Sequence, residues 1–117
     1  MTRDPNCLFC KIVADEIPAT IVQRDDATTA FRDIDPQAPV HVLVVPNDHI
    51  VDTGVLDAHL DQEVGRLLRT AAQVAEAEGI AQSGYRLVIN TGADALNSVP
   101  HLHVHVLGGR RLGWPPG

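Results

Sequence analysis

Hydrophobic residues recur at two different spacings along the chain, and each spacing predicts a different element. Over residues 56–78 they fall three or four positions apart, which is the spacing of one face of an α-helix. The members of this stripe are Leu60, Val64, Leu67, Leu68, Ala71, Val74 and Ala75. Gly79 follows the stripe and can end a helix in a left-handed conformation. We therefore expect one long helix whose stripe faces a core.

Elsewhere the hydrophobic residues form short runs bounded by turn residues, which is typical of strands. We expect strands over 21–24, 28–31, 40–45, 86–90 and 101–106, and a short helix over 8–15. Pro36 and Pro39 make residues 35–39 a loop, because proline fixes the backbone and removes a hydrogen-bond donor. Together these elements predict an α+β fold in one domain, residues 1–117, with a mostly antiparallel sheet covered by the long helix on one face.

The predicted last strand carries the strongest chemical signal. Its sequence, His-Leu-His-Val-His-Val over 101–106, alternates imidazoles with branched apolar side chains. In a strand the three histidines share one face, roughly 7 Å apart from one to the next, while the apolar residues share the other. Burying imidazoles costs free energy unless each finds a partner. The pattern therefore indicates a catalytic histidine with two supporting ones, and metal binding or a satisfied polar face is the alternative.

Composition narrows the function classes. The chain has 117 residues, with 44% hydrophobic and 21% charged residues, which is ordinary for a globular protein. Its net charge of −6 argues against broad capture of nucleic acid, which needs basic surfaces. No apolar run approaches the length of a membrane span, and residues 1–10 lack the apolar centre of a signal peptide. We therefore expect a cytoplasmic protein that binds neither membrane nor nucleic acid.

Two cysteines, Cys7 and Cys10, stand three positions apart. In a reducing cytoplasm they are not expected to form a structural disulfide. A Cys-x2-Cys pair is half of a zinc site, whereas a redox pair usually opens a helix beside a parallel sheet, which this layout lacks. Two reduced, partly buried thiols remain the plainest alternative.

Four sequence blocks, in order, resemble one known family. They are Phe31–His41, Pro46–Ile50, the histidine segment 101–106, and the C-terminal stretch with Leu107–Arg110 and Trp114–Gly117. Together they resemble the histidine triad (HIT) superfamily, and within it the Hint branch of nucleotide-binding hydrolases. The chain departs from the branch at Leu96 and Asn97, where Gly and Gln are common, and at Arg32, where His is common.

The resemblance implies a covalent mechanism at phosphorus. In the family the middle histidine attacks the α-phosphorus of a nucleotide derivative and water resolves the nucleotidyl-histidine, so His103 is the expected nucleophile. His105 and Ser98 are the expected phosphate contacts, and His41 supports the triad. The remaining residues implied to bind the nucleotide are Phe31, Asp33 for the ribose, Ile34, Leu43, Asn90, Asn97, Val99 and Trp114. For Phe31, Ile34 and Leu43, plain core packing is an equally simple interpretation.

The resemblance also implies a metal site and an assembly. Some HIT proteins hold a structural zinc at the positions of Cys7, Cys10, His49 and His101, which predicts one zinc ion per subunit. The family forms homodimers, and the tail with Trp114 is expected to reach the partner's active site. The implied substrate is a purine nucleoside phosphoramidate or a related nucleotidyl ester, with dinucleoside polyphosphate hydrolysis or a nucleotide-binding regulatory role as alternatives.

Overall fold

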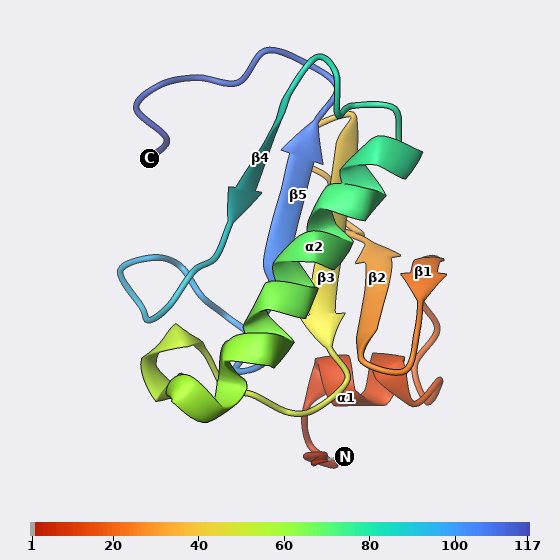
Figure 1. Ribbon diagram of the computed structural model, residues 1–117, viewed down its shortest axis with the longest axis vertical. Coiled ribbons are helices and arrows are strands. Elements are labelled where there is room, and N and C mark those ends of the chain that lie inside the picture. The colour runs from red at the N-terminus through yellow and green to blue at the C-terminus, as the bar shows by residue number, and fades with distance from the viewer. Residues whose placement is uncertain (1) are drawn as a thin grey trace.

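The sheet of the protein is antiparallel throughout and has the strand order β1-β2-β3-β5-β4 (Figure 1). The structure is a computed structural model, and it describes residues 2–117. Its strands are β1 (Ile21–Arg24), β2 (Thr28–Arg32), β3 (Val40–Pro46), β4 (Tyr85–Val88) and β5 (Val104–Gly108), and its helices are α1 (Leu8–Val13) and α2 (Asp61–Ala77). The expected fold class is therefore confirmed, with β5 lying between β3 and β4.

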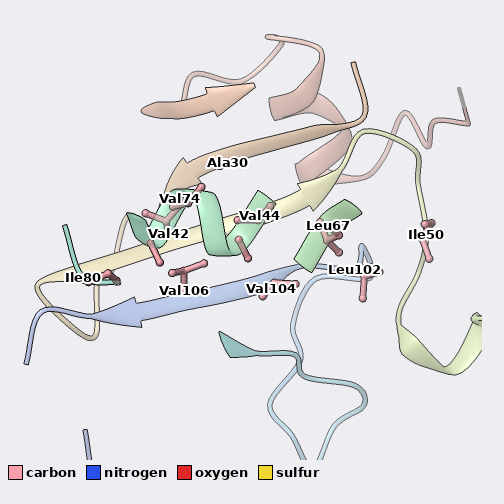
Figure 2. Close-up of a cluster of buried hydrophobic side chains, with 12 residues drawn as sticks. Ala30, Val42, Val44, Ile50, Leu67, Val74, Ile80, Leu102, Val104 and Val106 are labelled. Atoms are coloured by element: carbon pink, nitrogen blue, oxygen red, sulfur yellow. The ribbon is translucent and has the colours of Figure 1, made fainter. Parts of the chain in front are cut away.

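The long helix α2 crosses one face of the sheet and buries the main core against it (Figures 1 and 2). From the sheet, Val42, Val44, Val104 and Val106 are completely buried in this cluster. From the helix, the buried members include Leu67, Ala71, Val74 and Ala75. Alternate residues of each strand thus point to α2, and the intervening residues of β3 and β5 are left for the opposite face.

The short helix α1 packs against one end of that opposite face. Phe9, Cys10 and Ile12 form a second cluster with Phe31 and Leu43, which lie side by side in the β2–β3 ladder. The cap of α1 is the Cys7 thiol, which accepts a hydrogen bond from the backbone N–H of Cys10. Helix α1 therefore covers part of the face opposite α2.

The predicted long helix begins five residues too early. Two short 3₁₀ turns, Thr53–Val55 and Ala58–Leu60, precede α2 instead, and Asp52 and Asp57 cap them. Within α2, Leu68 is 38% exposed although its spacing predicts burial, and Thr70 is buried instead. Thr70 tolerates burial because its hydroxyl lies 3.3 Å from that of Thr28 on the sheet, within hydrogen-bond distance.

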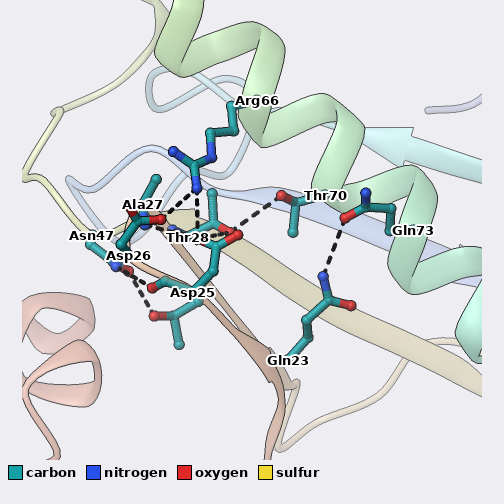
Figure 3. Close-up of polar contacts among 10 residues, drawn as sticks. Gln23, Asp25, Asp26, Ala27, Thr28, Asn47, Arg66, Thr70 and Gln73 are labelled. Carbon is teal, nitrogen blue, oxygen red and sulfur yellow. Dashed lines mark hydrogen bonds and ion pairs between the residues drawn. The ribbon is translucent and has the colours of Figure 1, made fainter.

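The turn between β1 and β2 is fastened to both β3 and α2 (Figure 3). The Asp25 carboxylate accepts hydrogen bonds from the backbone N–H groups of Ala27 and Thr28, both at 2.8 Å. Asn47, just after β3, donates from its amide to the Asp25 carbonyl at 3.0 Å. Arg66 of α2 forms an ion pair with Asp26 in the same turn. These contacts fix the β1–β2 turn relative to the end of β3 and to α2.

Three other elements differ by two or more residues from their predicted bounds. The short helix ends at Val13 rather than 15, and Asp15 has a left-handed φ of 60°. Strand β4 covers Tyr85–Val88 rather than 86–90. The last strand begins at Val104 rather than His101, because the backbone N–H of Leu102 donates to Ile50, in the segment after β3, instead of joining the ladder. Within residues 2–117, no helix has the length and apolar character needed to cross a membrane.

Candidate active site and candidate metal centre

A cavity of about 300 Å³ opens on the sheet face opposite α2. His103 lines it from just before β5 and His105 from β5 itself, while Phe31 and Leu43 line it from β2 and β3. Helix α1 closes one side with Leu8, Phe9 and Ile12. Ser98 and Val99, from the loop before the histidines, complete the rim. The structure therefore brings two of the three triad histidines to one small cavity with apolar walls.

The ring of His103 is held in one tautomer by a backbone carbonyl. Its Nδ1 lies 2.7 Å from the carbonyl oxygen of His101, which can only accept a hydrogen bond. Nδ1 therefore carries the proton, and in the neutral ring the lone pair is on Nε2. The edge of Phe9 packs against the ring, with 5.1 Å between centroids and 84° between planes. His103 is thus oriented as a nucleophile would have to be.

The ring proton of His105 is on the opposite nitrogen from that of His103, and His41 sets this placement. The backbone N–H of Gln37 donates to Nδ1 of His41 at 3.0 Å, so the proton of neutral His41 is on Nε2. That Nε2 lies 2.9 Å from Nδ1 of His105 and donates to it. The proton of neutral His105 is therefore on its own Nε2. One imidazole of the site can offer a lone pair while its neighbour offers an N–H.

Burial keeps this pair neutral at ordinary pH. Burial lowers the pKa of His105 to about 4, assisted by the nearby rings of His103 and His41 and opposed by the Asp33 carboxylate. The pKa of His41 is also lowered by burial, against the effect of Asp33 and Asp35. Asp33, His41 and His105 are residue types that can bind a metal ion, and their ligand atoms lie close together. Two imidazoles bound to one tetrahedral zinc ion would, however, have their nitrogens about 3.3 Å apart. The observed 2.9 Å fits a hydrogen bond better.

Asp33 follows β2 directly and lines the same cavity. Its backbone N–H donates to the carbonyl of His41, and one carboxylate oxygen accepts from the N–H of Asp35 at 2.8 Å. The other carboxylate oxygen lies 3.4 Å from Nε2 of His41. The carboxylate is therefore fixed beside the imidazoles, and its remaining lone pairs can accept from a ligand.

The structure does not bring every expected residue to the cavity. Asn90, Asn97 and Trp114 are not among its lining residues, and Trp114 is 82% exposed. In the part of the chain that the structure describes, the buried side-chain oxygen of Asn97 has no hydrogen-bond partner. Ile34 does reach the rim, but it is 99% exposed and forms no wall by itself. Within residues 2–117, fewer of the expected residues therefore surround the cavity than the resemblance implied.

Sequence reasoning missed the contribution of α1. Leu8 and Phe9 stand four and three positions before Ile12, which is the spacing of one helix face, and this signal could have identified them. Arg32 also touches the cavity, but its guanidinium is held by both carboxylate oxygens of Glu78 at the end of α2. Arg32 therefore contributes its backbone and stem to the site rather than a free positive charge.

A second cluster joins Cys7, Cys10, His49 and His101, whose ligand atoms all lie within 4.8 Å of one another. Nδ1 of His101 is 3.3 Å from the Cys7 sulfur, 3.5 Å from the Cys10 sulfur and 3.3 Å from Nδ1 of His49. The Cys10 sulfur is 3.4 Å from Nδ1 of His49. The structure thus brings together all four residues that the sequence pointed to.

This cluster fits a tetrahedral metal ion. Zinc bonds of about 2.0–2.1 Å to nitrogen and 2.3 Å to sulfur place two nitrogens about 3.3 Å apart and a nitrogen and a sulfur about 3.6 Å apart. The observed separations match both values. His101 donates from Nε2 to the carbonyl of Pro46 at 2.9 Å, so its Nδ1 lone pair points into the cluster. Burial lowers the pKa of His101 to about 4, which favours the neutral ring that a metal requires.

The histidine-lined cavity and the cysteine–histidine cluster are linked by one residue, His101. The ring of His101 belongs to the cysteine cluster, while its carbonyl orients the ring of His103. His101 is completely buried, and its backbone N–H donates to the carbonyl of Val99 on the cavity rim. A metal bound by the cluster would consequently fix the segment that aims His103 into the cavity.

The chain matches known proteins over most of its length. The HIT domain family model matches residues 14–112. Purine nucleoside phosphoramidase of Escherichia coli K12 is 50% identical over 106 residues, which cover 91% of this chain and 89% of that protein. A 14 kDa zinc-binding protein of Brassica juncea is 50% identical over 113 residues, covering 94% of this chain and 98% of that protein.

A solved structure agrees equally closely. The crystal structure of a HIT family hydrolase from Legionella pneumophila Philadelphia 1 superposes with a TM-score of 0.94 at 46% identity, covering 96% of this chain and 100% of that one. The antiparallel sheet and its histidine-lined cavity are thus those of a histidine triad protein. The chain belongs to the HIT family.

The partial burial of His105 predicts a pH dependence of stability. Its pKa is about 4 in the folded protein and about 6.5 in an unfolded chain. The unfolded state therefore binds more protons at acid pH, and the stability due to this group is complete above pH ~6.5 and lost as pH falls towards 4. Melting temperatures should fall less steeply over this range in His105→Asn than in the wild type. Exposed His59→Asn is the matched control and should keep the wild-type slope; equal slopes in all three proteins would contradict the prediction.

Proposed function

We propose that the protein hydrolyses purine nucleoside monophosphate derivatives at a P–N or P–O bond, with phosphoramidates as the primary substrates. The observation that carries this proposal is the opposite polarity of two neighbouring imidazoles at one cavity. His103 offers a lone pair on Nε2, and His105 offers an N–H. A nucleophile beside a fixed donor is what substitution at a phosphoryl group needs, because charge builds on the phosphoryl oxygens as the new bond forms.

In the proposed reaction His103 Nε2 attacks the α-phosphorus, and the P–N bond breaks as the new N–P bond forms. The leaving nitrogen takes a proton from water and departs as the free amine. The product of this step is a nucleotidyl-histidine, which water then hydrolyses to return His103 and release the nucleoside monophosphate. His105 donates to a phosphoryl oxygen in both steps. Ser98 and the backbone at Val99 lie at the same rim, where they can bind the remaining oxygens.

The nucleoside would occupy the apolar part of the cavity. Phe31 and Leu43 provide walls for the base and sugar, together with Ile12 of α1. The Asp33 carboxylate can accept from both vicinal hydroxyls of a ribose. A cavity of about 300 Å³ is at the small end of ligand sites, which suits a nucleoside better than a larger ligand.

A turnover screen tests the class of substrate. The relative from Escherichia coli is named purine nucleoside phosphoramidase, so AMP and GMP amidates are the first compounds to compare with diadenosine polyphosphates. Faster hydrolysis of the amidates supports the proposal. Preference for the polyphosphates, or tight nucleotide binding without turnover of either class, contradicts it and favours one of the two alternatives.

The role of His103 gives the sharpest kinetic prediction. His103→Ala should lower kcat for an AMP amidate by at least about 10³-fold, since an essential covalent group is removed. AMP binding, measured by calorimetry, should remain detectable because the base and ribose contacts are intact. His59→Ala, an exposed change in a 3₁₀ turn, should retain full activity. Near-normal turnover by His103→Ala would exclude the covalent route.

We also propose that Cys7, Cys10, His49 and His101 hold one structural zinc ion per subunit. Four protein ligands close a tetrahedral site, leaving no open position for water or substrate. The ion would supply folding free energy and orient His101, rather than take part in the chemistry. A relative named for zinc binding supports the choice of metal, and a reducing cytoplasm would keep the two cysteines free to bind it.

Elemental analysis of protein purified without chelator should find about one zinc per chain. The Cys7→Ser, Cys10→Ser double variant should lose that zinc and melt at a lower temperature, because metal binding is coupled to folding. His49→Gln should weaken zinc binding, while the matched control His59→Gln should retain the metal fully. Metal-free wild-type protein and an unchanged melting temperature in the double variant would show that the cysteines are ordinary thiols.

The proposed assembly is a homodimer that pairs through the β4 side of the sheet. Strand β4 pairs only with β5, so its other edge is unpaired within the described chain, and natural proteins usually cover such edges. Ile89, just beyond β4, and Leu68 on α2 expose apolar surface, at 37% and 38%. In such a dimer the tail with Trp114 would reach the partner's active site, which would account for the exposure of Trp114 in the single chain.

Light scattering at micromolar concentration should give twice the chain mass of 12.6 kDa. Ile89→Asp should shift the protein towards monomer, because a charge would be buried at the shared surface. Ile21→Asp places the same charge on β1, at the opposite edge of the sheet, and should leave the dimer intact. A monomeric wild type would refute the assembly.

A further inference from the structure

One peptide N–H, that of Gln37, helps to set which ring nitrogens of His41 and His105 carry protons. Gln37 donates to Nδ1 of His41, which leaves the proton of neutral His41 on Nε2. The Asp33 carboxylate oxygen 3.4 Å from that Nε2 favours the same tautomer. If His41 took the other tautomer, its Nε2 would accept from Nδ1 of His105. His105 would then present a lone pair to the cavity instead of an N–H, and a lone pair repels a phosphoryl oxygen. The position of Gln37 is therefore part of the chemistry.

Gln37 lies in a loop with few backbone hydrogen bonds of its own. Pro36 and Pro39 flank it and carry no N–H. Within residues 2–117, the backbone of Gln37 has two hydrogen-bonding partners: its N–H donates to His41, and its carbonyl accepts from the guanidinium of Arg110 at 3.1 Å. The loop is thus held between a histidine of the site and an arginine that lies 73 positions further along the chain.

The chain turn after β5 brings Arg110 to this place. Gly109 has a φ of 89°, a conformation that side chains strongly disfavour. A Cβ at Gly109 would also lie 2.8 Å from Cβ of Pro39, closer than atoms can approach. The backbone therefore passes directly over the loop, and Arg110 follows with one nitrogen on the Gln37 carbonyl and another on its neighbour's carbonyl, that of Arg111.

From this chain of contacts we propose that Arg110 is a positioning residue: by holding Gln37, it fixes the tautomer of His41 and thereby the N–H that His105 presents to the substrate. Arg110 does not line the cavity and is exposed, so it acts only through the loop. The kinetic part of this inference rests on the proposed hydrolase function. The tautomeric part does not, because it is a property of the protein without substrate.

The test compares Arg110→Met, which keeps the stem and removes the donors, with Arg110→Lys, which restores one donor. Arg111→Met is the matched control, since Arg111 is exposed in the same tail and its side chain forms no hydrogen bond within residues 2–117. Ring-nitrogen NMR shifts of the metal-loaded protein, without substrate, report the tautomers of His41 and His105. Hydrolysis of an AMP amidate reports kcat and KM separately.

Arg110→Met should give a mixture of tautomers at His41 and His105 and lower kcat by about threefold to tenfold, the usual effect of one lost hydrogen bond. Arg110→Lys should restore both, and Arg111→Met should match the wild type in both. Unchanged tautomers in Arg110→Met, or an equal effect of Arg111→Met, would overturn the proposal. If the tautomers shift but even the wild type hydrolyses no amidate, the positioning role is supported and the proposed function fails.

Should Arg110→Met lower the melting temperature, Gln37→Pro offers a second route to the same question. It removes the N–H that His41 accepts while leaving Arg110 in place. The same mixture of tautomers should appear at His41 and His105. A single wild-type tautomer in folded Gln37→Pro would show that this N–H does not set the polarity, and the proposal would be wrong.

Discussion

The burial of His101 is the constraint on which the rest of the site depends. A completely buried imidazole must satisfy both ring nitrogens, and the chain does this with the Pro46 carbonyl on one side and the cysteine cluster on the other. Because the ring is fixed in this way, the backbone carbonyl of the same residue is fixed too. That carbonyl selects the tautomer of His103. One buried residue therefore links the stability of the fold to the chemistry of the cavity.

Much of the fold could be predicted from the sequence, because buried faces of helices and strands require hydrophobic residues at regular spacings. The helix stripe and the alternation of Leu102, Val104 and Val106 both marked residues of the core against α2. The errors arose where tertiary hydrogen bonds outweigh the local pattern. Leu102 is buried as its period predicts, but its backbone bonds to Ile50 and leaves the ladder. Thr70 replaces Leu68 in the core because a partner hydroxyl on β2 makes a buried threonine acceptable.

The site was predictable where side chains carry the signal and unpredictable where the backbone does. The cysteines and histidines stood out by residue type, and the structure brings all four candidate metal ligands together. Gln37 gave no signal, since it acts through its N–H and carbonyl rather than its side-chain amide. Phe9 was missed for a different reason. The sequence predicts only core packing for an apolar residue on a short helix, whereas Phe9 packs both in the core and against the ring of His103.

The contact between α1 and the histidine segment has a consequence for the order in which the protein folds during synthesis. Cys7 and His101 are in contact although 94 positions separate them. A helix of six residues is too short to persist alone in water, so α1 gains its place only when the last strand arrives. During synthesis on the ribosome, Cys7 must therefore wait for its partner until His101 has been made. The cavity needs both segments and cannot form before then.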